Sequence, residues 1–336
     1  MTIGWRRIGA ALGAAVCALA LAAAPTPLQQ RNEQLLQQLR QVHGLTETQM
    51  QQLRAIFQRS GHAGQGNPAI STHPQTPEQC RATRAAAPPR DEAQAWARLC
   101  GGPNMAPLYD PATQTPAQAQ ACIDQYEFPD IPCEYPVVWV RAVEAAQICA
   151  AMGKRLCDAH EWEGACEGSL QPPDYRFDLA RGVDANTAVE RMRLAHNRAH
   201  APQARWSYGP DYRRGVCATG SQKTSGCPGG DWNACGSNTY PSGAFPDCRS
   251  PLGVYDLNGN AAEHMNLPLN EAQMASRGSR ELGVTEMKGS WFVFDTIRAH
   301  DDWCRWRAPY WHGARVLDPR SHENYHLGFR CCKTLP

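Results

Sequence analysis

This chain of 336 residues has no excess of charge, and beyond its first 24 residues it has no apolar run long enough to cross a membrane. Its 33 Lys and Arg almost balance its 32 Asp and Glu. The sequence therefore provides no field that would attract nucleic acid or an acidic membrane surface. No internal repeat is visible. We expect no nucleic-acid partner and no membrane span in the mature chain.

The first 24 residues have the features of a secretory signal peptide. Arg6 and Arg7 precede an apolar stretch of small residues, and Ala20–Ala22 offers a small-x-small cleavage site. The stretch is barely long enough to span a bilayer, and Pro25 and a polar tract follow it at once. We predict that residues 1–24 are removed and that the mature protein is exported, to the periplasm or outside the cell.

Cysteine, in contrast, is abundant. Of the 15 cysteines, Cys17 lies in the predicted signal, which leaves an even number. In an oxidising compartment an even number favours a disulfide framework over metal-binding or redox thiols. We predict at least five disulfides, one of them between Cys80 and Cys100. Cys149 and Cys157 flank a helix end and a turn, and we expect them to be neighbours.

The mature chain divides into three zones. Residues 25–60 are rich in Gln and have apolar residues at helical spacing, with a capping box at Thr46–Gln49, which predicts a short helical hairpin that docks on its own domain. The expected apolar stripe is Leu35, Leu36, Leu39, Val42, Met50, Leu53, Ile56 and Phe57. Residues 61–119 are rich in Pro, Gly and Ala with little periodicity, and we predict an extended connector.

Residues 120–336 form the predicted main domain, which is dense in Trp, Gly, Pro and Cys. An amphipathic helix is expected over Val143–Met152, ended by Gly153. A second helix is expected to start at Asp158, where Asp158–Glu161 gives another capping box. Beyond Leu170 the apolar residues follow neither the helical nor the strand period clearly. This pattern predicts an irregular α+β domain held by turns, disulfides and bound ions.

The string HENYH at His322–His326 matches the H-E-x-x-H signature of zinc proteases. That chemistry needs a helix, which places both imidazoles on one face. Pro319 lies just before the string and Gly328 just after it, so barely one helical turn fits. No His, Asp or Glu follows as a third ligand. We interpret the string as a surface loop rich in His.

Four other segments are more specific. MGKRLCDAHEWEGACEG (Met152–Gly168) is similar to a G-K-R-L-P-T-E-x-E-W-E-x-A motif, and SPLGVYDLNGNAAEH (Ser250–His264) to F-G-L-Y-D-M-x-G-N-V-W-E-W. MKGSWF and HLGFRCC match R-G-G-S-W and a terminal G-F-R. In this order they resemble the formylglycine-generating enzyme family, also called sulfatase-modifying factors. The resemblance implies an irregular mixed fold, with HENYH as the loop before the closing strand.

The resemblance also implies two disulfides. One joins Cys166 to Cys331. The other joins Cys304 to the middle of the domain, where Cys217, Cys227 and Cys235 remain open as partners.

A calcium site is expected in the turn DLNGNAAEH. Asp256, Asn258 and Asn260 alternate and Glu263 follows, so hard oxygen ligands cluster there. The resemblance implies calcium held by the side chains of Asp256 and Glu263 and by the main-chain carbonyls of Gly259 and Ala261. The alternative is an Asx-rich turn held by its own hydrogen bonds.

The resemblance fails at the catalytic cysteines. The family binds copper with two cysteines a few residues after G-G-S, and a thiolate pair suits Cu(I). Ser290 matches the family serine and is the one catalytic candidate, but Val293 and Arg298 stand at the cysteine positions. The family Trp residues are replaced by Ala262 and His264. We expect no copper site and no formylglycine synthesis by the family route.

Two hypotheses follow. The first is a pseudoenzyme, an exported domain that binds a peptide or protein in the ancestral groove or has a structural role. The second is a metal-dependent oxidase with an altered site, using copper or non-heme iron. Its candidate ligands are His264, His300, His312, His322 and His326. The sequence leaves open which is correct, whether iron binds, and what the ligand is.

Overall fold

The computed structural model describes residue 1 and residues 24–86, 92–309 and 314–336. The predicted signal peptide and His312 lie outside these residues. The helices are α1 (Pro27–His43), α2 (Glu47–Ser60), α3 (Pro77–Ala85), α4 (Glu92–Cys100), α5 (Ala142–Ala151), α6 (Ala159–Glu167) and α7 (Ala185–His200). The strands are β1 (Met105–Leu108), β2 (Ala121–Asp124), β3 (Arg155–Leu156), β4 (Ala262–Leu267), β5 (Val284–Lys288), β6 (Leu327–Phe329) and β7 (Cys331–Thr334). The fold is mixed α+β, with short elements and long irregular connections, as the sequence predicts.

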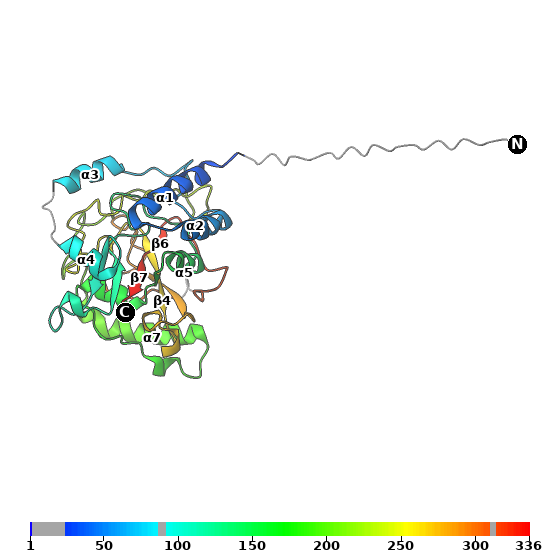
Figure 1. Ribbon diagram of the computed structural model, residues 1–336. Helices are drawn as coiled ribbons and strands as arrows, with labels where there is room; N and C mark the ends of the chain where they lie inside the picture. Colours follow the sequence, from blue (N-terminus) through cyan, green and yellow to red (C-terminus); the bar gives the residue numbers. More distant parts are fainter. Residues whose placement is uncertain (2–23, 87–91, 310–313) are drawn as a thin grey trace.

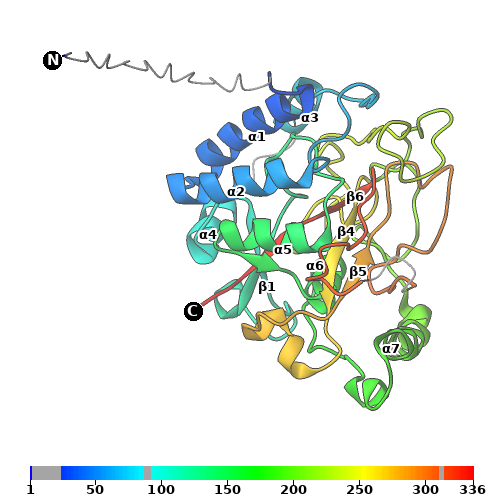
Figure 2. The same cartoon turned by 90° about the vertical axis from the view of Figure 1, so that its right-hand side faces the viewer.

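The helical hairpin is present and docks on the main domain. The Thr46 side chain accepts from the Gln49 amide, and the Gln49 side chain accepts from the Thr46 amide, which completes the predicted capping box. Helix α1 packs on α2, and α2 packs on α5 (Figure 2). The expected stripe is buried in the core shared with α5, except that Val42 is exposed at 38%.

Two small sheets organise the domain. The first has the order β1-β2-β7-β3 with antiparallel pairs, so the C-terminal strand β7 lies inside the sheet. The second has the order β5-β4-β6, with β4 antiparallel to β5 and parallel to β6. Helix α6 contacts β4 and β5. One face of the second sheet therefore carries Glu263, Glu286 and Lys288 toward α6, since alternate residues of a strand share a face.

Two regions are more regular than the sequence suggests. The segment interpreted as an extended connector contains α3, α4 and β1, and β1 pairs with β2 of the main domain. Beyond Leu170, α7 is a helix of 16 residues, capped by the Asp184 side chain. Helix α7 buries only Ala188, Val189, Met192 and His196, and this stripe is too sparse to give a clear apolar period. It lies at the opposite end of the domain from the hairpin (Figures 1 and 2).

All cysteines from Cys80 onward are paired, but several partners differ from those expected. The disulfides are Cys80–Cys133, Cys100–Cys122, Cys149–Cys331, Cys157–Cys332, Cys166–Cys304, Cys217–Cys248 and Cys227–Cys235. The pairing of Cys80 with Cys100 is wrong. Cys149 and Cys157 do not bond each other but bond the adjacent residues Cys331 and Cys332.

The two disulfides implied by the family resemblance, Cys166–Cys331 and Cys304 to the middle of the domain, are also wrong. Cys331 bonds Cys149 of α5, which leaves Cys166 for Cys304. The reason lies in β7, because adjacent residues of a strand point to opposite faces. Cys331 therefore reaches α5 on one side, while Cys332 reaches Cys157 on the other.

We expect the mature protein to have no free thiols, because each of these cysteines lies in a disulfide. Thiol titration of the denatured, unreduced protein checks this, and four or more free thiols per chain would contradict it. Replacing both Cys149 and Cys331 with Ser should lower the free energy of unfolding by about 2–5 kcal/mol, the usual effect of losing a native disulfide. Chemical denaturation measures that loss.

Candidate functional site

The segment after β5 holds the residues at which the resemblance implies catalytic groups. Ser290, the predicted catalytic serine, is fully buried. Its Oγ donates to Asp302 Oδ2 at 2.8 Å and accepts from the Gly259 amide at 2.8 Å. Ser290 thus ties the turn before β4 to the loop after β5. This placement gives it a structural role, and a catalytic role stays a prediction.

The two expected copper positions hold no sulfur. Val293 is fully buried in an apolar cluster that includes Tyr325, and Arg298 is exposed over two aromatic rings. Cys304 is bonded to Cys166. Between residues 24 and 336, every cysteine in the described segments is in a disulfide. These residues contain no thiolate pair for Cu(I).

Aromatic side chains from distant segments gather around Val293. We call this group the aromatic cluster; it consists of His62, Trp139, Trp232, Trp291, Tyr325 and His326. His62 stacks on Trp232 with ring centres 4.7 Å apart. At the other end His326 lies 4.5 Å from Trp291. His62, Trp232 and His326 are partly exposed, so the cluster is partly open to solvent.

A surface pocket of about 470 Å³ adjoins the aromatic cluster. It is lined by two segments, residues 70–74 and 220–225, together with Asn238. The Ser221 amide donates to the Phe292 carbonyl at 2.7 Å, which joins the pocket wall to the segment that carries Val293. Lys223, also in the wall, places its Nζ 5.9 Å from the Tyr325 ring centre. The pocket therefore combines hydroxyl, amide and ammonium groups beside an aromatic surface.

Trp139 lies at the centre of the cluster in a strained conformation. Its φ of +55° is in the left-handed region, which a bulky side chain rarely adopts. Its indole is buried, and Nε1 has no hydrogen-bond partner. Such strain persists where the surrounding packing imposes it, and it is common at ligand sites.

The HENYH string is not helical. Residues 321–326 form an irregular segment and a turn before β6, as expected for the loop leading into the closing strand. Glu323 lies 2.6 Å from Arg141 and 3.4 Å from His62, at the edge of the aromatic cluster. Burial, with a smaller contribution from Glu144, raises the pKa of Glu323. The string thus supplies an ion pair and two cluster members and lacks the helical arrangement of a zinc protease.

Among the described residues, the proposed ligands His264, His300, His322 and His326 do not gather into a metal-binding group. His264 is buried, with Nε2 donating to the Val140 carbonyl at 3.0 Å and Nδ1 accepting from Thr285 Oγ1 at 2.8 Å. Burial lowers its pKa to about 4, so it is a neutral core residue. His300 stacks on Trp306 with ring centres 4.9 Å apart. His322 and His326 do not belong to any group of metal-ligating side chains found among the described residues.

One such group was not anticipated from the sequence. Over the described residues, Asp174, His196 and His200 are the only three His, Cys, Asp or Glu side chains close enough to hold a metal ion. The two histidines are four residues apart in α7, a spacing visible in the sequence. This spacing places the two side chains on one face only if the segment is helical. The segment lacks the strong apolar period that would predict a helix.

The turn expected to bind calcium is held by an arginine. Arg330 is fully buried and donates to Glu263 at 2.6 and 2.7 Å, engaging both carboxylate oxygens. Trp162 Nε1 also donates to Glu263 at 3.0 Å. Asp256 has one oxygen with no hydrogen-bond partner among the described residues, and burial raises its pKa to about 6. Asp256 suits a cation, but Glu263 as placed here does not, and calcium at this turn stays a prediction.

Fold and site together define a disulfide-rich α+β domain with a buried Arg–Glu pair behind its closing strand. Residues 116–335 match the sulfatase-modifying factor enzyme 1-like domain, well over half of the chain. The chain therefore belongs to this family, as the four motifs predict.

Other comparisons add little. A solved structure, described as the crystal structure of CarF, is 12% identical and matches with a TM-score of 0.32. That match covers 69% of this chain and 97% of CarF. A likeness this weak carries no argument about function. The comparison with curated proteins finds no match. No helix in the described residues is long and apolar enough to cross a membrane.

Proposed function

We propose that this protein is an exported, non-copper member of the family that binds an extended segment of a peptide or protein. The proposal rests on the side chains of the segment after β5. There Val293 fills a buried aromatic site, and Cys304 is committed to a disulfide with Cys166. The copper route depends on two thiolates at these places, while the scaffold around them is retained.

The surface at this place supports a peptide ligand. The exposed part of the aromatic cluster offers apolar rings for a side chain, and rings of this kind bury a large area with little loss of rotamer freedom. The adjoining pocket of about 470 Å³ supplies polar groups that can bond to an extended backbone. Lys223 adds a positive charge between the two, which favours an acidic residue in the ligand.

Export is part of the proposal. The seven disulfides are what an oxidising compartment allows, and the N-terminal sequence has the features of a secretory signal. Cell fractionation, with N-terminal sequencing of the exported form, tests this part separately from binding.

Selection from a displayed peptide library tests the binding function. We expect selected peptides to bind the wild type and to lose about tenfold in affinity for Trp232→Ala, as is usual when an interface aromatic is truncated. Tyr109→Ala, a partly buried aromatic outside the cluster, is the matched control and should bind normally. Failure to select any peptide, or equal loss in both variants, would contradict the proposal.

The same preparation tests the absence of family chemistry. A sulfatase-type Cys-x-Pro-x-Arg peptide, incubated with copper and oxygen, should show no formylglycine by mass spectrometry. Aldehyde formed at a rate that depends on Cys304 would prove this part wrong. A metal-dependent oxidase remains the alternative prediction, but no observation at the aromatic cluster favours it, and the redox-metal content of protein purified without chelators decides it.

A further inference from the structure

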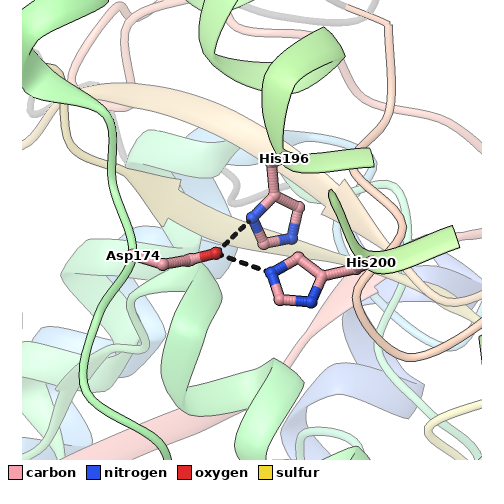
Figure 3. Close-up of side chains that lie close together, drawn as sticks. All are labelled: Asp174, His196 and His200. Atoms are coloured by element: carbon pink, nitrogen blue, oxygen red, sulfur yellow. Dashed lines mark hydrogen bonds and ion pairs between the residues drawn. The ribbon is translucent and has the colours of Figure 1, made fainter. Parts of the chain in front are cut away.

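Three metal-ligating side chains converge beside α7, outside the aromatic cluster (Figure 3). Asp174 comes from the loop before α7, while His196 and His200 lie four residues apart on the helix and so share a face. Asp174 Oδ2 lies 2.8 Å from His196 Nδ1 and 2.8 Å from His200 Nε2. One carboxylate oxygen thus faces two imidazole nitrogens.

One ring nitrogen of His196 is committed to the backbone, and the other faces Asp174. His196 Nε2 lies 2.9 Å from the Arg305 carbonyl, which can only accept, so Nε2 carries the proton. In the neutral ring Nδ1 is then a bare lone pair. It is buried and faces Asp174 Oδ2, another lone-pair atom, at 2.8 Å. Two such atoms at 2.8 Å repel unless a proton or a metal ion neutralises them.

Charged side chains also surround the group. Arg307 Nη2 lies 3.2 Å from Asp174 Oδ1. Arg307 is itself balanced by Glu163, whose Oε1 lies 3.0 Å from Arg307 Nε and 3.6 Å from His196 Nε2. Lys288, 3.0 Å from Glu163, is a second cation beside the same carboxylate.

We propose that Asp174, His196 and His200 bind a divalent first-row transition metal of the Zn²⁺ class. Two imidazoles and one carboxylate are a ligand set that such ions prefer, whereas Ca²⁺ and Mg²⁺ prefer oxygen alone. His196 already donates its other nitrogen to a backbone carbonyl, as metal-bound histidines usually do. The Asp174 and His200 side chains are 34% and 26% exposed, so the ion has an entry path and room for water.

This metal site is independent of the proposed peptide-binding function. It uses no residue of the aromatic cluster, the adjoining pocket or the Asp256–Glu263 turn. Bound metal would fasten α7 to the loop that precedes it, in addition to the apolar core that Tyr175 of the loop shares with Val189 and Met192 of the helix.

Isothermal titration of tag-free, chelator-stripped protein with Zn²⁺ tests the site. We expect saturable binding of one ion per chain. His200→Gln and Asp174→Asn should each weaken Zn²⁺ binding at least about tenfold. Removing a residue that only hydrogen-bonds to a metal ligand lowers metal affinity about 10–100-fold, and removing a ligand itself should cost no less. His300→Gln, a histidine outside the group, is the control and should bind normally.

Co²⁺ in place of Zn²⁺ gives a second readout. The wild type and His300→Gln should show visible ligand-field absorption that both ligand variants lack, and circular dichroism of each variant confirms that it is folded. Absence of saturable binding to the wild type, the result expected if the group holds only a proton, overturns the proposal. Equal affinity in wild type and both ligand variants overturns it as well.

Discussion

Glu163→Gln is expected to lower the free energy of unfolding by about 3–5 kcal/mol, the usual result of breaking a buried ion pair from one side. Glu163 is completely buried in α6 and lies 3.0 Å from both Lys288 Nζ and Arg307 Nε. Burial alone would raise the pKa of Glu163, but Arg307 and Lys288 hold it well below its usual range. Without this carboxylate, two buried cations lose their shared partner.

Glu286→Gln, in the same buried group, should have the opposite effect at pH 8. Glu286 accepts from the Ala308 amide, a bond that Gln can keep through its carbonyl oxygen. Burial raises the pKa of Glu286 from 4.5 to about 7, although Lys288 and Arg307 partly offset this. Holding it ionised at pH 8 opposes folding by up to about 3 kcal/mol, at about 1.4 kcal/mol per pKa unit. The variant should therefore be more stable by about 1–3 kcal/mol.

The sign of the pH dependence follows from the direction of that change. A carboxyl with a higher pKa in the folded than in the unfolded chain binds more protons when folded between pH 4.5 and about 7. The contribution of Glu286 to stability therefore falls as pH rises through this window, and Glu286→Gln should lack that slope. Denaturant unfolding of Glu163→Gln and Glu286→Gln at pH 5 and pH 8 measures the effect. If Glu286→Gln is destabilised at pH 8 about as much as Glu163→Gln, this account is wrong.

The sequence predicts those elements whose signals are local. The hairpin α1–α2 and helices α5 and α6 each combine a cap with apolar residues at helical spacing, and each was expected within one or two residues of its position. Helix α7 has a good cap at Asp184 but buries few apolar residues, because its inward face also carries His196. A helix that buries polar groups does not show the apolar period on which such predictions depend.

Features that need the tertiary fold escaped prediction for a different reason. The disulfide partners depend on how β7 enters the first sheet, since that strand sends Cys331 and Cys332 to opposite faces. The aromatic cluster draws on segments as far apart as His62 and His326, and no local pattern joins them. Four motifs were enough to predict the family but not the Arg330–Glu263 pair, because no motif by itself shows which residue balances Glu263.

Arg330→Met is expected to destabilise the protein by about 3–5 kcal/mol for a related reason. The guanidinium also donates to the carbonyls of Tyr255 at 2.9 Å and Asp124 at 3.1 Å, so it links β2, the turn before β4 and the closing strand. Its loss leaves Glu263 buried near Glu127. Burial, Asp256 and Glu263 already raise the pKa of Glu127 well above its usual range.

Two controls separate the charge effect from lost packing. Arg330→Met combined with Glu263→Gln should be less destabilised than Arg330→Met alone, because no uncompensated buried charge remains. Arg176→Met removes an exposed pair with Asp178 and should change stability little. Denaturant midpoints of the four proteins, wild type included, provide the comparison. A double variant no more stable than Arg330→Met would assign the loss to packing.

The same variant decides the calcium question at the Asp256–Glu263 turn. With Arg330 present, both Glu263 oxygens are engaged, and this geometry predicts an equal melting temperature with Ca²⁺ and with chelator, against the calcium site that the resemblance implies. In Arg330→Met, Glu263 and the unpartnered oxygen of Asp256 face no arginine, and Ca²⁺ should raise the melting temperature by mass action. A Ca²⁺-dependent rise in the wild type that Glu263→Gln abolishes would instead establish the calcium site that the family motif predicts. In that case the ion would have to displace Arg330 from Glu263, because one carboxylate cannot give the same two oxygens to both cations.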